Sequence, residues 1–332
     1  MSKRSTSALT IRAYRGEGDL QPIAALYNAA AAVDGPNWGQ SEDDVRLSLT
    51  SPDARPEENA FLFEVDGHRV AYGRIFLEEG PEQSVFFLRG IVHPDWRRQG
   101  IGSRVIERLE QRAEERLGEA KNETVYLHAG AQLKHEDRQA LFRKMGYAVA
   151  RYFLDMECPL NEVGAPIELQ EQGYPAGVVV RTMAQRPDLR AVWQTADEAF
   201  RDHWGHTEST FEQWQHWVSE PDHRPELWLV AWDSEKDEPA GICLNGVNPD
   251  RNARLGRQEG WVDVLAVRRP YRRQGLGRAL LLAGMSGLQR AGMEWAMIGV
   301  DTENLTGALR LYERAGFRPV RRSAAFRKRI GR

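Results

Sequence analysis

The sequence predicts two tandem copies of one α/β domain, each built around a mixed α+β sheet. Three observations lead to this prediction. First, the stretch YRRQGLGRAL at 271–280 nearly repeats WRRQGIGSRV at 96–105. Second, both stretches follow an apolar, β-prone run and precede an amphipathic helical pattern, and the other elements come in the same order in both halves. Third, 332 residues is long for one hydrophobic core and ordinary for two domains.

The first half consists of strand and helix signals separated by turn residues. Runs rich in β-branched and aromatic residues predict strands at Leu9–Tyr14, Ala60–Val65, Arg69–Phe76, Val85–Val92, Thr124–His128 and Tyr147–Met156. Apolar residues at helical spacing predict helices at Leu20–Ala32, Glu42–Leu49, Ile101–Leu117 and Glu136–Met145. The dipeptide Asp66-Gly67 predicts a tight hairpin turn between the second and third strands.

The second half repeats this order. Strands are expected at Val178–Arg181, Leu227–Trp232, Ala240–Val247 and Trp261–Val267, then at Trp295–Val300 and as a final strand pair. Helices are expected at Leu189–Phe200 and Phe211–Ser219, from the glycine loop to Arg290, and at Thr306–Ala315. The two copies of the glycine loop, at 96–105 and 271–280, lie about half a chain length apart, and so long a repeat period indicates a duplicated domain. The stretch 158–177 is rich in Pro and Gly and is interpreted as the linker between domains at 1–157 and 178–332.

Composition narrows the class of protein. Apolar residues make up 41% and charged residues 28% of the chain, which is typical of a soluble globular protein. The net charge of -3 gives no reason to expect a nucleic-acid partner. The two cysteines, Cys158 and Cys243, suggest neither a disulfide framework nor a zinc site. The N-terminus lacks the apolar core of a signal peptide, and no run reaches membrane-spanning length, so no membrane association and a cytoplasmic location are expected.

The repeated loop has the features of an anion site. Gly275 and Gly277 lack a Cβ, so backbone can approach a ligand closely, and the first N–H groups of the following helix have no partner within the helix. The helix dipole adds positive potential, and Arg272, Arg273 and Arg278 add mobile positive charge around it, so a pyrophosphate would fit. The alternative is a β–α turn without a ligand, in which the glycines only permit the bend and the arginines are solvated. A P-loop is excluded because no Lys-Ser or Lys-Thr follows the glycines, and the GxG spacing disfavours a Rossmann fingerprint.

The pattern Arg/Gln-x-x-Gly-x-Gly/Ala between strand and helix resembles the acyl-CoA pyrophosphate loop of the GNAT superfamily of N-acetyltransferases. The stretch GVDTENLTGALRLYERAGFRPV at 299–320 is similar to the family's closing pattern, and ALFRKMGYAV in the first half matches it in part. The tandem layout resembles the two-domain acetyltransferases that include mycothiol synthase. The resemblance implies a mixed α/β fold and acetyl-CoA (coenzyme A) as co-substrate.

The resemblance also implies which residues hold the cofactor. In the second half these are Leu265, Ala266 and Val267 for the pantetheine, Asn304 near the cofactor, and the loop residues Arg272, Arg273, Gln274, Gly275, Leu276, Gly277 and Arg278. In the first half they are the loop residues Arg97, Arg98, Gln99, Gly100, Ile101 and Gly102. Asn304 is equally suited to capping the helix that follows it. Keeping the loop leaves open whether the first domain binds CoA.

Acetyl transfer to an amine needs a base for the amine and an acid for the leaving thiolate. Tyr312 lies where the family places its tyrosine acid. Glu259 and Asp263 are the candidate bases, and strand alternation puts them on the same face. Asp263 interrupts an apolar strand, where an unpaired carboxylate is costly, whereas Glu259 is equally explained as a solvated strand end. His203 is a minor rival as the base.

The first domain lacks these groups. Aligning the two halves sets Phe142 opposite Tyr312 and Lys134 opposite Asn304. It also sets Leu88 and Ser84 at the positions of the two candidate bases. The first domain is therefore expected to be catalytically degenerate, with chemistry in the second.

The acceptor is less well defined. His203, Trp204 and His206 lie between the first two helices of the second half, a region that walls the acceptor site in the family. They suit an apolar pocket with polar tips, and no third ligand accompanies the histidines, so no metal is expected. The leading hypothesis is an acetyl-CoA-dependent N-acetyltransferase acting on a small-molecule amine, as a monomer or homodimer. The alternatives are acetylation of a cysteinyl pseudo-disaccharide, as in mycothiol synthase, and a non-catalytic acyl-CoA-binding or sensor protein.

Overall fold

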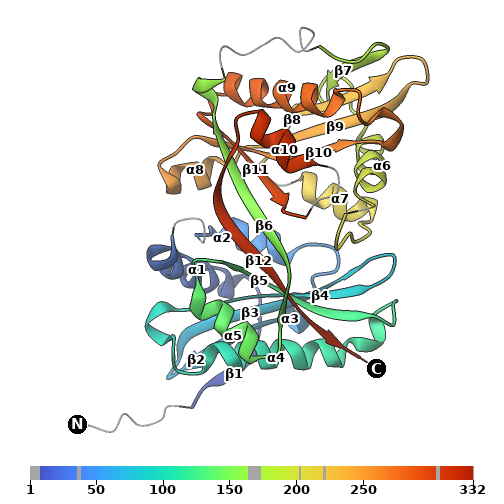
Figure 1. Cartoon of the computed structure of the whole chain (residues 1–332). Helices are drawn as coiled ribbons and strands as arrows, with labels where there is room; N and C mark the ends of the chain where they lie inside the picture. Colours follow the sequence, from blue (N-terminus) through green and yellow to red (C-terminus); the bar gives the residue numbers. More distant parts are fainter. Residues whose placement is uncertain are drawn as a thin grey trace. The chain divides into compact units, whose positions relative to one another are not determined.

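The chain forms two compact units in the computed structural model, which describes residues 8–35, 39–163, 173–201, 203–219, 222–303 and 307–331 (Figure 1). The N-terminal unit comprises the chain up to Ala150 together with the segment from Ala324 on, and the C-terminal unit comprises Arg151–Ser323. Both units combine helices with a mixed sheet, which confirms the predicted fold class.

The N-terminal unit holds a sheet in the order β1-β2-β3-β4-β5, with the end of β12 beside β5. Its strands are β1 (Thr10–Ala13), β2 (Ala60–Val65), β3 (His68–Glu79), β4 (Ser84–Val92), β5 (Val125–Gln132) and the end of β12 (Arg318–Ile330). Its helices are α1 (Leu20–Asp34), α2 (Glu42–Leu49), α3 (Pro56–Asn59), α4 (Ile101–Glu115) and α5 (Glu136–Lys144). Neighbours from β1 to β4 are antiparallel, and β4 and β5 are parallel.

Side chains from the two faces of this sheet belong to two apolar clusters. Phe86, Leu88 and Leu127 pack with residues of α4 and α5 in one cluster. Tyr72 and Ile91 pack with residues of α1 and α2 in the other. Helices therefore cover both faces of the sheet, as expected for strands whose inward and outward side chains are both apolar.

The C-terminal unit repeats the arrangement. Its sheet has the order β6-β11-β10-β9-β8-β7, with the start of β12 beside β6. Its strands are β6 (Ala148–Pro159), β7 (Val178–Thr182), β8 (His223–Asp233), β9 (Glu238–Gly246), β10 (Glu259–Val267) and β11 (Trp295–Asp301). Its helices are α6 (Leu189–Phe200), α7 (Phe211–Val218), α8 (Pro249–Leu255), α9 (Leu276–Arg290) and α10 (Ala308–Arg314). As in the first unit, the strand that precedes the glycine loop, β10, runs parallel to the strand that follows, β11.

The last strand of each repeat contributes to the other repeat's sheet. β6 follows α5 in the first repeat, yet it pairs antiparallel with β11 from Phe153 to Pro159. The end of β12, from Ala324 on, belongs to the N-terminal unit and neighbours β5. The compact units therefore differ from the expected domains at 1–157 and 178–332. A single strand β12 also replaces the expected final strand pair, and β6 continues to Pro159 within the expected linker.

Most helices and strands lie where the sequence places them. The hairpin at Asp66-Gly67 has positive φ at both residues, 50° and 78°, as a tight two-residue turn requires. The short helices α3 and α8 were not expected, since both begin with a proline among polar residues, a composition typical of loops. Among the described residues, no helix has both the length and the apolarity that crossing a membrane would require.

Candidate active site

The glycine loop has the same backbone geometry in both units. Before α9, Arg273 and Gly275 adopt positive φ, 64° and 85°, and Gly275 forms the N-cap of the helix. Before α4, Arg98 and Gly100 adopt 62° and 81°, and Gly100 is the N-cap. A Cβ at either glycine would meet no atom within 4 Å, so the space in front of each helix N-terminus is open. Each loop thus presents unpaired backbone N–H groups to an anion.

The first arginine of each loop fastens the loop to its own unit. Arg272 donates to the carbonyl oxygen of Val267 at 2.9 Å and to that of Ala199 at 3.1 Å. Arg97 donates to the Val92 carbonyl at 3.3 Å and makes two hydrogen bonds to Asp34, at 2.8 and 2.7 Å. These side chains are therefore held in place, which corrects the expectation that Arg272 supplies mobile charge.

Of the remaining loop residues, some side chains are held within the unit and others are exposed. Gln274 donates to the carbonyl of Pro270 at 3.1 Å, and Gln99 repeats this bond with Asp95 at 3.1 Å. Leu276 and Ile101 are buried in the core, so their side chains anchor the helix start. Arg273 and Arg278 are exposed, and they are the loop arginines of the C-terminal unit best placed to meet phosphate oxygens.

Just before the glycine loop in the sequence, β10 separates from its neighbour β11. The two strands pair in parallel only from Glu259 to Val262, opposite Trp295 to Ile298. Leu265, Ala266 and Val267 lie past this point and continue to pair with β9. The N-terminal unit shows the same parting, since β4 pairs with β5 only from Ser84 to Phe87. In each unit the backbone edge of the parted strand faces the space between the strands, where an extended ligand can form β-like hydrogen bonds.

A β-bulge distinguishes the C-terminal unit at this point. The register between β10 and β9 shifts between Val262 and Val264, which leaves Asp263 as the extra residue. Asp263 is exposed, and a Cβ at Gly246 would collide with its carboxylate, so the glycine makes room for it. In the N-terminal unit, β3 and β4 pair without any such shift through Leu88. The bulge turns Asp263 out of the regular alternation at the place where the strands part.

Glu259, the other candidate base, has a structural environment. It is only 3% exposed, and its carboxylate lies 3.2 Å from Arg251 Nη2 and 3.8 Å from Arg257 Nε. The indole N–H of Trp261 also donates to it at 3.2 Å. The expectation that Glu259 is a solvated strand end is therefore wrong, because its carboxylate is buried and faces two guanidiniums. This environment favours a structural role over the predicted role as a base.

Tyr312 lies on α10 with its ring packed against Phe317, 6.1 Å between centroids. It is 7% exposed. Burial, with a smaller influence of Cys243, raises the pKa of Tyr312 to about 12, so the phenol is protonated at neutral pH. It is therefore a hydrogen-bond donor under all ordinary conditions. Phe142 occupies the corresponding place on α5 and offers no hydroxyl.

Cys243 is a buried thiol beside the parted strand of the C-terminal unit. It lies on β9, paired with Leu265 of the parted strand, and is fully buried. Burial and the charge of Asp263 raise the pKa of Cys243 to about 12. Cys243 and Tyr312 belong to the same apolar cluster, and Cys243 pairs with the parted strand that carries Asp263. No local sequence pattern marks Cys243 or Gly246 as part of the site, and only the pairing of β9 with β10 places them there.

The residues expected around the acceptor lie between α6 and α7. His203 packs edge-on against Phe200, with 4.5 Å between ring centroids. His206 Nε2 lies 3.6 Å from a carboxylate oxygen of Asp197. Trp204 lies near Phe153 and Arg151, at centroid distances of 6.2 and 5.3 Å, and Phe153 pairs with Asp301 at the end of β11. Trp204 therefore stands beside the open end of the parted strands, whereas His206 is engaged by a carboxylate.

Asn304 lies outside the described residues. Within the described part of the chain, no group of three His, Cys, Asp or Glu side chains is placed to hold a metal ion.

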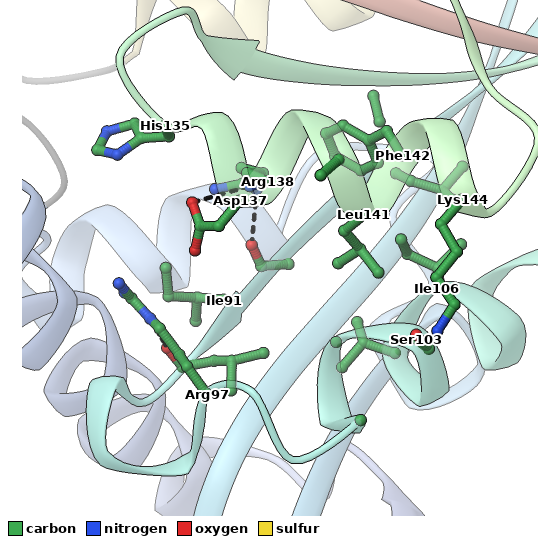
Figure 2. Close-up of a pocket in the computed structure, with 18 of the residues that line it drawn as sticks. Ile91, Arg97, Ser103, Ile106, His135, Asp137, Arg138, Leu141, Phe142 and Lys144 are labelled. Atoms are coloured by element: carbon green, nitrogen blue, oxygen red, sulfur yellow. Dashed lines mark hydrogen bonds between the residues drawn. The ribbon is translucent and has the colours of Figure 1, made fainter.

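The N-terminal unit contains a cavity of about 450 Å³ in the corresponding place. It runs from the loop residues Arg97 and Gly100 along the parted part of β4 to Arg138 on α5. Figure 2 shows Arg97 reaching toward this space from the loop side, and Asp137 and Arg138 from α5. The cleft of this unit is therefore open, although it lacks the carboxylate and the phenol of its counterpart.

Comparison with known proteins agrees with this geometry. The model of the acetyltransferase (GNAT) family matches the chain twice, at residues 23–147 and 189–317. A mycothiol acetyltransferase from Geodermatophilus obscurus is 31% identical over 296 residues, covering 89% of each chain. A GCN5-related N-acetyltransferase from Sphaerobacter thermophilus matches with a TM-score of 0.74 at 28% identity, over 98% of this chain and 96% of the other.

The fold also recurs in a more distant protein. A tandem GNAT protein from the clavulanic acid biosynthesis pathway has a TM-score of 0.69 at 16% identity, over 98% of this chain and 99% of the other. One family match falls in each unit, and together they span most of the chain. The chain belongs to the acetyltransferase (GNAT) family and is a tandem N-acetyltransferase that uses an acyl-CoA.

Proposed function

We propose that the chain transfers the acetyl group of acetyl-CoA to the amine of a small molecule, a cysteinyl pseudo-disaccharide, and that the C-terminal unit carries out the reaction. The relatives named mycothiol acetyltransferase support this acceptor, because one of them aligns with 89% of this chain at 31% identity. The observation that carries the assignment to the C-terminal unit is the bulge at Asp263, which sets a carboxylate beside the parted strands. The N-terminal unit has no such bulge at Leu88.

The pyrophosphate of acetyl-CoA would lie against the N-terminus of α9, near Gly275 and the exposed Arg273 and Arg278. The pantetheine would run along the parted part of β10 and pair with the backbone of Leu265, Ala266 and Val267. Its direction would bring the thioester toward the bulge. Asn304 remains a proposed neighbour of the cofactor from the family resemblance alone.

In the proposed reaction, Asp263 accepts a proton from the ammonium group of the acceptor, directly or through a water molecule. The neutral amine then attacks the thioester carbonyl and a C–N bond forms. The C–S bond breaks with its electron pair going to sulfur, and the extra proton on the new amide nitrogen passes through water to that thiolate, which leaves as the CoA thiol. Tyr312 donates a hydrogen bond to that sulfur. Because its pKa of about 12 lies above the ordinary range of thiols, hydrogen bonding to the thiolate is favoured over complete proton transfer.

The acceptor would enter beside Trp204, whose neighbours lie at the end of β11. An indole next to the open end of the strands suits a sugar ring, since aromatic faces pack well against apolar carbohydrate surfaces. His203 lies near the same loop and is the second candidate for proton removal. Its edge-on packing on Phe200 supports a packing role instead.

A second function belongs to the N-terminal unit, which we propose binds an acyl-CoA without catalysis. The loop geometry and the open cavity support binding. The phenylalanine at position 142 and the leucine at position 88 argue against chemistry there.

The acceptor assignment is tested by offering the intact protein acetyl-CoA together with the cysteinyl pseudo-disaccharide. We expect a product heavier by one acetyl group, with release of one thiol per product. The matched control is the same compound with its cysteinyl amine blocked. Turnover of simple aryl or alkyl amines with none of the pseudo-disaccharide would contradict the proposed acceptor but leave the acetyltransferase in place.

A further inference from the structure

Two arginines face each other across the sheet of the N-terminal unit. Arg74 on β3 and Arg89 on β4 are directly paired in the antiparallel register. Directly opposed side chains share one face of the sheet, with Cβ atoms about 5 Å apart, and like charges in such a pair are destabilising. Arg89 is exposed and lines the cavity of this unit. Arg74 donates to the carbonyl oxygen of Ser48 on α2, and because a guanidinium has five N–H donors, the pair can bind an anion as well.

A third arginine approaches from α5. Arg138 Nη2 donates to the carbonyl of Gly90, the residue after Arg89, at 3.0 Å. Burial is the main cause that lowers the pKa of Arg138, and Arg89 contributes in the same direction. The carboxylate of Asp34 also acts on Arg138, but that carboxylate already makes two hydrogen bonds to Arg97. Positive charge therefore gathers where β4 has parted from β5.

Two tyrosines border the same face of the sheet. Tyr72 lies two residues before Arg74 on β3, so both side chains point to the face covered by α1. Tyr72 is 1% exposed, and its buried hydroxyl has no hydrogen-bond partner among the described residues. Tyr27 on α1 packs edge-on against it at 6.2 Å, and Arg74, Arg89 and Arg138 all lower the pKa of Tyr27 against the larger effect of burial. A buried phenol without a partner beside arginines points to a missing acceptor atom.

The C-terminal unit carries apolar residues at the corresponding positions. The repeat alignment places Val264 at the position of Arg89, and Val264 pairs with Leu244, the counterpart of Arg74. Both residues belong to or pack against an apolar cluster of that unit. Ala308 takes the position of Arg138. The fold therefore does not require these arginines, since the same strands pack with aliphatic side chains in the second copy.

The cavity of the N-terminal unit connects two arginines of this cluster, Arg89 and Arg138, to the glycine loop. Its lining includes Arg97 and Gly100 at one end and Arg89 and Arg138 at the other. A CoA thioester held at the loop would extend its acyl group toward the arginines.

We propose that Arg74, Arg89 and Arg138, with the hydroxyl of Tyr72, form a carboxylate-binding site at the acyl end of the N-terminal cleft. The carboxylate belongs either to a dicarboxylic acyl group on CoA or to a separate small acid. The first source rests on the proposed binding of acyl-CoA by this unit, and the second does not. Arginine forks bind carboxylates through paired hydrogen bonds, which provides both affinity and selectivity over neutral groups.

The test is calorimetric titration of the full-length chain carrying Gly275→Glu, so that binding reports on the N-terminal unit. The probes are succinyl-CoA, butyryl-CoA of the same acyl length, and free succinate. We expect succinyl-CoA to bind about tenfold more tightly than butyryl-CoA or better. The variant Arg74→Leu with Arg89→Val, which installs the residues of the C-terminal unit, should abolish the difference and leave butyryl-CoA affinity unchanged.

The other outcomes are equally informative. Binding of free succinate that disappears in the double variant, with equal affinities for the two thioesters, supports the separate acid as the ligand. Succinate binding with no thioester binding supports the site and refutes acyl-CoA binding by this unit. Equal thioester affinities without succinate binding overturn the proposal. The double variant should keep its melting temperature in the absence of ligand, because it removes a like-charge pair, and a variant with both arginines changed to lysine should retain succinate binding in part.

Discussion

The two units share a loop and a parted pair of strands but differ in what lies beside them. Gly100 and Gly275 have the same left-handed backbone, and Arg97 and Arg272 fasten their loops in the same way. In the C-terminal unit a bulge presents Asp263, whereas β4 passes Leu88 without one. The proposed acyl-CoA-binding loop and the proposed proton-transfer groups therefore lie on separate parts of the fold, and the N-terminal unit has the first without the second.

A second contrast lies on the face covered by the first helices. The C-terminal unit fills this face with Leu244 and Val264, and the N-terminal unit places Arg74 and Arg89 there. Leu244 and Val264 give the C-terminal unit an apolar surface on this face. The two arginines of the N-terminal unit supply charge that suits recognition of an anion.

The largest effect is expected from Asp263→Asn. Loss of the general base should lower kcat/KM by about 100-fold to 10,000-fold, with acetyl-CoA affinity unchanged because the loop is untouched. Steady-state kinetics and calorimetry on the same preparation measure the two quantities. Full activity in this variant, or an equal loss in both quantities, would remove Asp263 from the reaction.

The next effect is expected from Tyr312→Phe, which gives the C-terminal unit the residue that the N-terminal unit has. Removing the hydrogen bond to the leaving sulfur should lower kcat by about 10-fold to 100-fold. The buried ring keeps its contact with Phe317, so stability should hardly change. Chemical denaturation provides the control, and a change in stability with unaltered kcat would assign Tyr312 to packing.

Glu259→Gln should affect stability instead of rate. The substitution leaves Arg251 without its buried carboxylate, whereas Arg257 keeps Glu157, so the expected cost is about 2 kcal/mol. Glu294 lies on the surface of the same unit, and Glu294→Gln should stay within about 0.5 kcal/mol of the unchanged chain. Denaturant titration measures both, and a large fall in kcat with normal stability would restore Glu259 as a candidate base.

The smallest effect concerns pH. Since burial raises the pKa of Tyr312 to about 12, the protonated donor persists at every pH below that value. The kcat profile should therefore show no alkaline fall below about pH 11, whereas a tyrosine of ordinary pKa would produce one near pH 10. An alkaline fall near pH 10 that vanishes in Tyr312→Phe would contradict the burial of this phenol.

Local patterns predicted much of this structure. Three signals depend only on neighbours in the sequence: the repeated loop motif, the helical periodicity and the turn at Asp66-Gly67. The two-unit mixed fold that they predicted is confirmed. The exchange of β6 and β12 could not be predicted, because both strands have the same local signals and pairing either with its own repeat or with the other satisfies them equally. The local sequence therefore does not determine which of the two sheets each strand joins.

The site was predicted less completely for the same reason. Asp263 stood out as a charge in an apolar strand, but the bulge that exposes it depends on the register with β9. Glu259 is a carboxylate on the same strand, and the sequence does not distinguish its environment from that of Asp263. Only the approach of Arg251 and Arg257 in the folded unit explains why Glu259 is buried. The pairing of Arg74 with Arg89 likewise follows from strand register and from no local motif.

The most direct test compares acetyl transfer by two matched variants of the intact chain, Gly275→Glu and Gly100→Glu. Both glycines have left-handed φ and open space for a Cβ, so the two substitutions impose similar backbone strain and place the same bulk and negative charge in the two loops. The proposed division of labour predicts that Gly275→Glu abolishes turnover and that Gly100→Glu retains it within about threefold. Turnover that survives Gly275→Glu and is lost in Gly100→Glu would place the chemistry in the N-terminal unit and contradict it.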